Sequence, residues 1–158
     1  MTNKLTVSLF GHRIIEDYQA IENKLYELLR IVMQNGSREI EFLVGRNGDF
    51  DLMAASVIRK LKKETGKENI YLTLVLPYET AELRNNTKSF ESYYDSIEIC
   101  DSHNFKYAIV ARNHEMIDRS DMVVVYVKNE SGGAYQSLKY AEKNQKRIIN
   151  LYHTQNDN

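Results

Sequence analysis

The sequence predicts an α/β fold, in which one mostly parallel five-stranded sheet lies between two layers of helices. Short apolar runs alternate with stretches whose apolar residues recur at helical spacing, and this alternation is typical of parallel strands joined by helical crossovers. The apolar runs are nearly continuous, as expected for strands that are buried on both faces. The 158 residues suffice for one domain with its own core.

Five segments have the composition of buried strands, because each is a short run rich in Val, Ile, Leu and Phe. Parallel crossovers are right-handed, and ligands bind where the strand order reverses. We therefore expect the order 3-2-1-4-5, in which the first and fourth strands lie side by side. The five predicted strands are Leu5–Phe10, Ile40–Val44, Ile70–Leu76, Met122–Val127 and Arg147–Tyr152.

Three connections between these strands carry apolar residues on one helical face. The first helix is expected to stop at Gly36 and the second at Gly66, since glycine commonly follows a helix C-terminus. The third helix is expected from Gly133 to about Asn144. The residues that define the three faces are Ile21, Leu25, Leu28 and Val32, then Leu52, Ala55, Val57, Ile58 and Leu61, then Leu138 and Ala141.

The stretch from Thr80 to Ser120 is longer than one crossover needs. It is interpreted as a loop, a helix around Phe90–Cys100 and a second helix around Phe105–Asp118, although "KYAIV" within the second also fits a short strand. We find neither a repeat nor a linker, so residues 1–152 are expected to form a single domain. Residues 153–158, "HTQNDN", are expected to be a flexible tail.

The composition narrows the classes of function. The formal net charge is −1, without the basic excess of a nucleic-acid-binding domain, and "RKLKK" (Arg59–Lys63) is expected to be a solvated helix face. A single cysteine, Cys100, excludes an internal disulfide and favours a reducing compartment. The four histidines are scattered, so no metal site is expected. No segment has the ~20 apolar residues of a membrane span, and a cytoplasmic protein is expected.

The loops that follow the strands are the candidate site. They are Gly11–Arg13, Gly45–Asp51, Pro77–Glu79 and Ser131–Gly133. The carboxyl ends of parallel strands meet at one edge of the sheet, where glycine permits close approach and a helix N-terminus attracts phosphate. Each loop alone is explained by a turn. Glycine or arginine in three loops at one edge favours a pocket for an anionic ligand.

An ordered set of motifs runs through the chain: "LFGHR", "VGRNGDFDLMAASVIRKLKK", "LTLVLPY", "ARNHEMIDRSDMVVVYVKNESGGAYQSLKYA" and "RIINLY". Together they resemble the SLOG superfamily of Rossmann-like proteins, and within it the YpsA-like branch, formerly a domain of unknown function. The resemblance extends roughly from Leu5 to Tyr152. It implies a Rossmann-like three-layer sandwich.

The superfamily includes LOG phosphoribohydrolases, the DNA-uptake protein DprA and sensor domains of bacterial defence systems. The resemblance therefore implies a pocket for a nucleotide or an ADP-ribose-like signal, in a protein of a bacterium or its virus, and is compatible with a homo-oligomer. No cofactor is expected. The residues expected to line the pocket are Gly11, His12, Arg13, Gly45, Arg46, Asn47, Gly48, Asp49, Pro77, Tyr78, Arg112, Asn113, Ser131, Gly132, Gly133, Ala134 and Tyr135.

The chain departs from the LOG pattern in the fourth loop. LOG enzymes carry Pro-Gly-Gly-x-Gly-Thr-x-x-Glu with a catalytic glutamate, whereas Ser131–Lys139 keeps the two glycines and has lysine at the glutamate position. This departure favours a sensor or sequestering protein over an enzyme. Lys139 is expected either to contact a second phosphate or to point to solvent.

Two alternatives stay open. One is a LOG-like hydrolase of nucleoside monophosphates with a relocated carboxylate, and the other is DprA-like nucleic-acid binding. The candidate carboxylates are Asp49, Glu79, Glu115 and Asp118.

Overall fold

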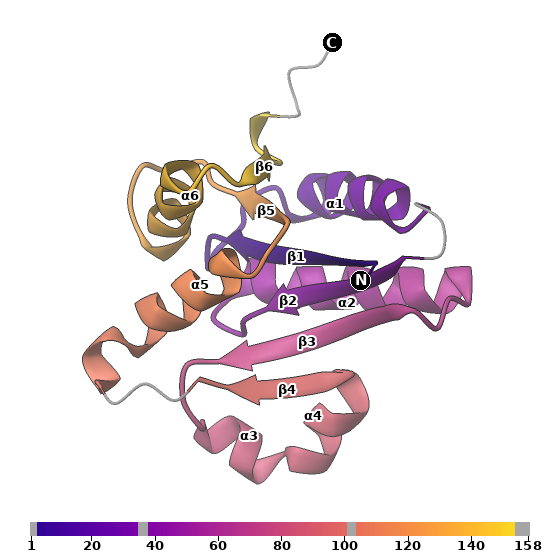
Figure 1. Ribbon diagram of the computed structural model, residues 1–158, viewed down its shortest axis with the longest axis horizontal. Helices are drawn as coiled ribbons and strands as arrows, with labels where there is room; N and C mark the ends of the chain where they lie inside the picture. The colour runs from indigo at the N-terminus through magenta and orange to yellow at the C-terminus, as the bar shows by residue number, and fades with distance from the viewer. Residues whose placement is uncertain (1–2, 35–37, 101–103, 154–158) are drawn as a thin grey trace.

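The computed structural model in Figure 1 describes residues 3–34, 38–100 and 104–153. It is an α/β fold with a parallel sheet in the order β4-β3-β2-β1-β5-β6. The predicted count of five strands is wrong, because a sixth strand extends the sheet beyond β3; the other five follow the predicted order. The strands are β1 Lys4–Gly11, β2 Glu39–Val44, β3 Ile70–Leu76, β4 Ser96–Ile99, β5 Met122–Tyr126 and β6 Arg147–Asn150.

The additional strand β4 lies where the sequence predicted a helix around Phe90–Cys100. That helix is wrong from Tyr94 onward: α4 ends at Tyr93, and the chain then pairs with β3. Asp95 starts the pairing, since its N–H donates to Leu72 O at 2.9 Å and its Oδ2 accepts from Leu72 N at 2.7 Å. The four residues "SIEI" alternate polar and apolar side chains, as a half-exposed edge strand does.

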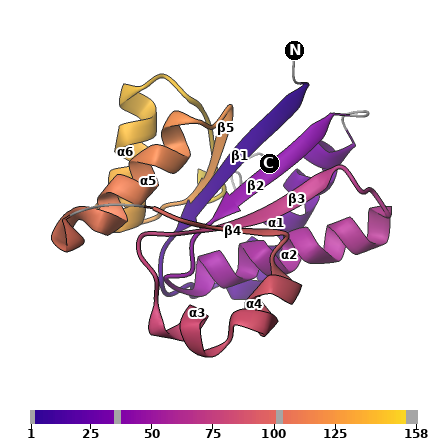
Figure 2. The same cartoon turned by 60° about the horizontal axis from the view of Figure 1, so that its bottom comes forward.

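The helices cover both faces of the sheet. Figure 2 shows α1 and α2 on one side of the sheet and α5 and α6 on the other. Gly66 ends α2 in the left-handed conformation, as predicted, whereas Gly36 lies outside the described residues. The alternative strand at "KYAIV" is wrong, because this segment is helical. The helices are α1 Tyr18–Met33, α2 Asp49–Thr65, α3 Ala81–Asn85, α4 Thr87–Tyr93, the 3-10 helix η1 Phe105–Tyr107, α5 Ala108–Asp118 and α6 Gly133–Lys143.

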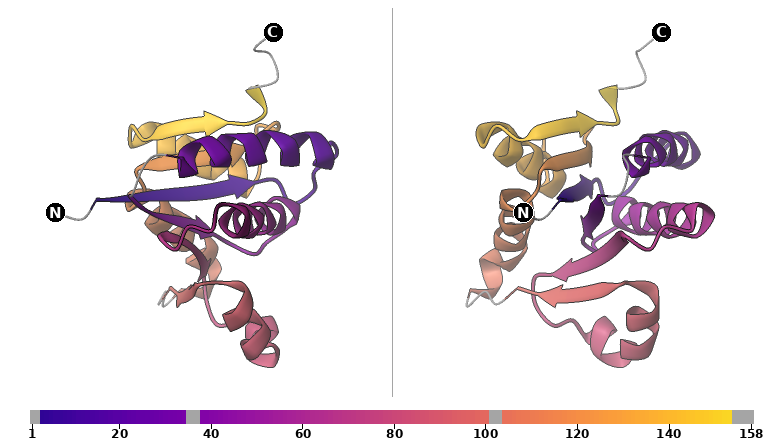
Figure 3. Two further views of the ribbon diagram at one scale, coloured as in Figure 1. Left: turned by 90° about the vertical axis from the view of Figure 1, so that its right-hand side faces the viewer. Right: turned by 45° about the vertical axis from the view of Figure 1, so that its right-hand side comes forward.

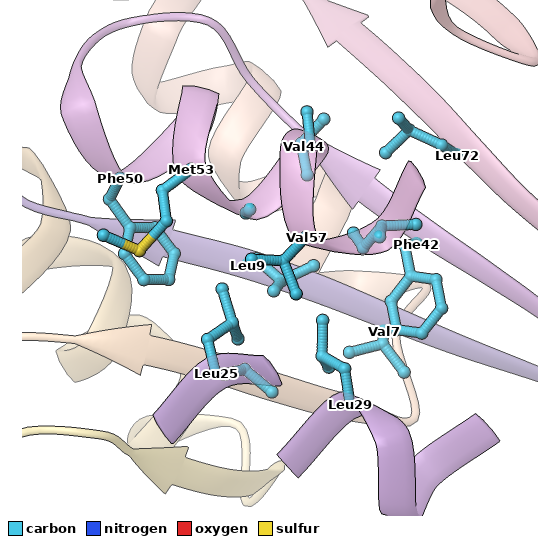
Figure 4. Close-up of a cluster of buried hydrophobic side chains, with 14 of the residues drawn as sticks. Val7, Leu9, Leu25, Leu29, Phe42, Val44, Phe50, Met53, Val57 and Leu72 are labelled. Carbon is cyan, nitrogen blue, oxygen red and sulfur yellow. The ribbon is translucent and has the colours of Figure 1, made fainter. Parts of the chain in front are cut away.

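The larger part of the core lies between the sheet and the pair α1 and α2. Figure 4 shows Leu25 and Leu29 of α1 facing Phe50, Met53 and Val57 of α2 across the end of the sheet. A smaller apolar cluster packs α5 and α6 against the opposite face. The faces predicted for the helices are correct in most positions. Leu52 is the exception, with 45% exposure, because Met53 occupies the inward position of that turn.

The register of β1 and β5 brings two of the predicted loops together. The two strands are parallel neighbours, and Gly11 lies opposite Tyr126. His12 Nε2 accepts hydrogen bonds from Lys128 N at 2.9 Å and Asn129 N at 3.1 Å, so the loops that follow β1 and β5 are in direct contact. The predicted adjacency of these loops is confirmed. In the described residues, no helix is both long and apolar enough to cross a membrane.

Candidate functional site

A pocket of about 340 Å³ opens at the carboxyl edge of the sheet, beside the ends of β1 and β5. The end of β1, the β2–α2 connection, α5 and the first turn of α6 form its walls. Its lining contains nine of the predicted site residues and four others. The lining residues are Phe10, Gly11, His12, Arg13, Asn47, Asp51, Ile109, Arg112, Asn113, Gly132, Gly133, Ala134 and Ser137.

The N-terminus of α6 presents unpaired backbone amides to this pocket. The first turn closes with Gln136 N donating to Gly132 O at 3.0 Å, and no side chain caps the helix. The N–H groups of Gly133, Ala134 and Tyr135 therefore have no partner among the described residues. Gly132 has φ of 93°, which residues with a Cβ rarely adopt. Free amides at the positive end of a helix dipole form a favourable seat for an anion.

Arg112, on α5, places a buried cation in the wall of the pocket. The residue is 3% exposed, its Nη1 donates to Val75 O at 3.0 Å, and its Nε donates to Asn113 Oδ1 at 2.9 Å. It forms no ion pair with any carboxylate of the described chain. Burial lowers the pKa of Arg112, and the nearby charge of Asp51 opposes that shift. A buried charge without an ion pair is costly, so an anion in the pocket would compensate it.

Asp51 is the carboxylate of the pocket, and the sequence analysis did not select it. Its Oδ2 accepts from Asn47 N at 2.8 Å. Burial raises the pKa of Asp51, while the Asn47 N–H and the charge of Arg112 oppose that change. A Cβ on Gly45 would lie 2.8 Å from Arg112 Nη1 and 3.1 Å from Asp51 Oδ2. Glycine at position 45 therefore makes room for both charged groups.

Asp49, which was expected to line the pocket, has a structural position instead. Its Oδ2 accepts from Ile15 N at 3.1 Å, and its own N–H donates to Arg13 O at 2.7 Å. These bonds tie the start of α2 to the loop after β1. A Cβ on Gly48 would lie 2.4 Å from Arg13 Cα, so glycine is needed for this contact.

Arg46 is directed away from the pocket. Its guanidinium pairs with Glu82 at 2.9 Å, donates to the Tyr94 hydroxyl at 2.9 Å and lies over the ring of Phe90 at 4.7 Å. These contacts connect the loop after β2 to α3, α4 and the residue after α4. The sequence analysis interpreted the α3 segment as a loop. The predicted residues outside the pocket lining are Gly45, Arg46, Gly48, Asp49, Pro77, Tyr78, Ser131 and Tyr135.

His12 lines the pocket, but its Nε2 is already engaged. It accepts from the two amides of the loop after β5, which requires an unprotonated Nε2. Burial lowers the pKa of His12, in agreement with this neutral form. The ring therefore joins the two loops that hold the pocket.

Lys139 points away from the pocket. Its Nζ lies 3.2 Å from Glu142 Oε1 and its side chain is exposed, which agrees with the expectation of a solvent-facing lysine. The contact with a second phosphate stays a prediction. The other candidate carboxylates are also elsewhere. Glu79 pairs with Arg84, Glu115 accepts from Cys100 Sγ, and Asp118 accepts from Tyr140.

Sequence reasoning missed four lining residues, Phe10, Asp51, Ile109 and Ser137. Ser137 could have been predicted from the sequence, because Ser137 lies one helical turn after Gly133 and on the same face of the helix. Asp51 stands two residues after Asp49 on the first turn of α2, and only the packing of α2 decides which of the two faces inward. No group of acidic, histidine or cysteine side chains in the described ranges is arranged to hold a metal ion.

No model of a known protein family matches the sequence, and no curated protein does. Solved structures with a similar fold exist. DprA from Streptococcus pneumoniae aligns with a TM-score of 0.64 and 14% identity over 91% of this chain and 49% of its own. DprA from Helicobacter pylori, described by its single-stranded DNA binding mode, aligns with a TM-score of 0.62 and 20% identity over 91% of this chain and 63% of its own.

A third structure, TM1055, aligns with a TM-score of 0.60 and 15% identity over 92% of this chain and 72% of its own. The likeness is one of fold. It shows a Rossmann-like α/β fold, and both the SLOG superfamily and its YpsA-like branch stay predictions. The chain spans less than two thirds of the length of either DprA structure.

Proposed function

We propose that the protein binds a nucleotide-derived anion, such as a nucleotide or an ADP-ribose-like signal, and holds it without cutting it. The observation that carries the proposal is the buried Arg112 guanidinium, which forms no ion pair with any described residue and lines the same pocket as the open N-terminus of α6. The phosphate would accept from the amides of Gly133 and Ala134. Arg112 and the exposed Arg13 would supply the counter-charge.

The dimensions of the pocket agree with a ligand of this class. Its volume of about 340 Å³ lies at the lower end of the ~300–1,000 Å³ range of small-molecule sites. Phe10 and Ile109 give apolar surface, and Asn113 and Ser137 add polar groups beside it. Such a mixture suits a phosphorylated riboside better than a bare inorganic ion.

Retention rather than cleavage follows from the positions of the carboxylates. A general acid or base contributes typically ~10²–10⁴-fold to a rate, and position 139 supplies a solvent-facing lysine. Asp51, the pocket carboxylate, is held by Asn47 N and lies near Arg112. Binding without turnover suits a sensor or a sequestering protein.

Calorimetry with AMP and ADP-ribose tests binding on a matched pair of variants. A Cβ at position 133 meets no atom within 4 Å, so both Gly133→Ala and Gly133→Asp are expected to fold. We expect Gly133→Ala to bind within a few-fold of the parent protein. Gly133→Asp places a carboxylate at the phosphate seat and should weaken binding at least ~100-fold, about 2.7 kcal/mol. If the two variants bind with equal affinity, the loop Ser131–Gly133 is only a turn and does not bind the phosphate.

A second candidate is binding of single-stranded nucleic acid, which the outer face of α2 favours. Arg59 lies 4.1 Å over the ring of Tyr93 and Lys60 lies 5.3 Å from the ring of Tyr26, beside hollows that also contain Lys63. Cations beside aromatic rings are typical of single-strand binding surfaces, and one structural neighbour is described by that activity. An oligonucleotide whose binding is lost in Lys63→Glu and kept in Gly133→Asp would favour this candidate.

A further inference from the structure

A second hollow, of about 230 Å³, lies at the opposite, amino-terminal edge of the sheet. Its floor comes from three neighbouring strands: Leu5 near the start of β1, Met122 at the start of β5, and Ile149 of β6. Helix α1 runs beside β1 and β6 in both Figure 1 and Figure 3, and its side chains form one wall of the hollow. The hollow shares no residue with the candidate functional site.

The wall that α1 contributes is apolar. Leu28, Ile31 and Val32 follow helical spacing and lie on one face. Val32 is buried in the core, whereas Ile31 is 57% exposed and offers apolar surface to the hollow. The body of the hollow can therefore remove an alkyl chain from water.

Two arginines lie at the rim of this hollow: Arg38, from the segment before β2, and Arg147, the first residue of β6. Arg38 Nε is buried and has no hydrogen-bond partner, and it is the single buried side-chain nitrogen or oxygen in this state across the described residues. A buried N–H without an acceptor is destabilising and is rare in folded proteins. Arg147 likewise makes no side-chain hydrogen bond or ion pair within the described ranges.

The third charged group at the rim is already used. Asp121 Oδ2 accepts from Thr6 N at 2.8 Å, and Asp121 N donates to Thr6 O at 2.8 Å, which fixes this residue on β1. It forms no ion pair with either arginine of the described chain. Two guanidinium groups and one carboxylate leave one positive charge to be balanced.

We propose that this hollow binds an apolar monocarboxylate. The carboxylate accepts from the terminal guanidinium nitrogens of Arg38 and Arg147, and the alkyl chain lies on Leu5, Met122 and Ile149. Guanidinium groups match the geometry of a carboxylate, and a single negative charge balances the rim. The volume is below the ~300 Å³ at which drug-sized sites begin, so the ligand is a short-chain acid or the last residue of a peptide.

Amide NMR titrations of the whole chain with hexanoate, hexanol and hexylamine test the carboxylate requirement. Hexanoate should bind saturably and shift the amides of Leu5, Met122 and Ile149. Hexanol, with the same chain and no charge, should bind at least ~10-fold more weakly, the size of a lost charge-assisted hydrogen bond. Hexylamine should not bind. Equal binding of hexanol and hexanoate, or no shifts with either, would overturn the proposal.

The variant Arg38→Gln removes the charge and keeps a shorter polar side chain. It should weaken the binding of hexanoate at least ~10-fold and leave the binding of hexanol unchanged. Arg30→Gln is the matched control, because Arg30 lies on α1 and pairs with Glu27 outside the hollow. An unchanged hexanoate affinity in Arg38→Gln would contradict the assignment. If this variant does not fold, the hexanoate and hexanol comparison on the parent chain still decides.

The source of the carboxylate is distinguished with a short peptide that ends in leucine, as a free acid and as an amide. Tighter binding of the free-acid peptide than of hexanoate assigns the hollow to protein C-termini, and tighter binding of hexanoate assigns it to free acids. Gly133→Asp should leave these affinities unchanged, since that position lies at the other edge of the sheet. Loss of hexanoate binding in Gly133→Asp would contradict two independent sites.

Discussion

Two helices start at the carboxyl edge of the sheet after glycine-containing loops, and the two starts behave differently. At α2, Asp49 N donates to Arg13 O and Asp51 Oδ2 accepts from Asn47 N, so the start of the helix is tied to the two loops beside it, while Phe50 N and Asp51 N have no partner in the described chain. At α6, three amides have no partner in the described chain and a Cβ on Gly133 would meet empty space. The loop before α2 therefore packs against the loop after β1, whereas the loop before α6 is open to a ligand.

The charges of the two starts strengthen this contrast. The first turn of α2 carries Asp49 and Asp51. Their negative charges interact favourably with the positive end of the helix dipole. The first turn of α6 has no acidic residue. A glycine-rich loop before a helix therefore does not by itself indicate a phosphate seat, because the same residues also allow two loops to pack backbone against backbone.

The largest expected effect is a difference in stability between alanine substitutions at Gly48 and at Gly133. Gly48→Ala places a Cβ 2.4 Å from Arg13 Cα, a backbone atom that cannot move without shifting the loop after β1. We expect its free energy of unfolding to fall by about 3 kcal/mol. Gly133→Ala should cost nothing measurable, since the added methyl group meets no atom. Urea denaturation of both variants measures the difference, and equal losses would contradict the contrast.

Acid is expected to loosen the connection between the loops after β1 and β5. The folded-state pKa of His12 is lowered by burial, so the unfolded chain binds the proton more readily. Stability from this group is present above pH ~6.5, the usual pKa of histidine, and is lost as the pH falls through the lower folded pKa. Denaturation at a series of pH values should show this loss, and His12→Gln should reduce it. An identical pH dependence in the variant would exclude His12 as its source.

The smallest expected effect is on the hydrolysis of AMP. Lys139→Glu restores the acidic residue of the LOG pattern, yet position 139 faces solvent beside Glu142 rather than the pocket. The variant should therefore release no free base from AMP, as measured by chromatography. Hydrolysis of AMP by Lys139→Glu would show that α6 presents side chains to the ligand as well as backbone amides.

Sequence patterns predicted the sheet order and the pairing of the Gly11 and Gly132 loops, because hydrophobic periodicity and crossover handedness are local or general properties. They did not predict β4, whose four residues form a strand only through pairing with β3. They also assigned Arg46 to the pocket, since the partners that turn it away, Glu82 and Tyr94, are distant in sequence. Residue type and loop position were predictable, whereas side-chain direction depended on tertiary contacts.

The central claim is that the amides of α6, and not those of α2, receive the anion. It is tested most directly by recording amide shifts of the isotope-labelled protein during titration with AMP. We expect large saturable downfield shifts at Gly133, Ala134 and Tyr135, because these N–H groups gain a charged acceptor. Asp49 N, which already donates to Arg13 O, should change little. Shifts confined to the first turn of α2, with Gly133 and Ala134 unchanged at saturation, would contradict the account.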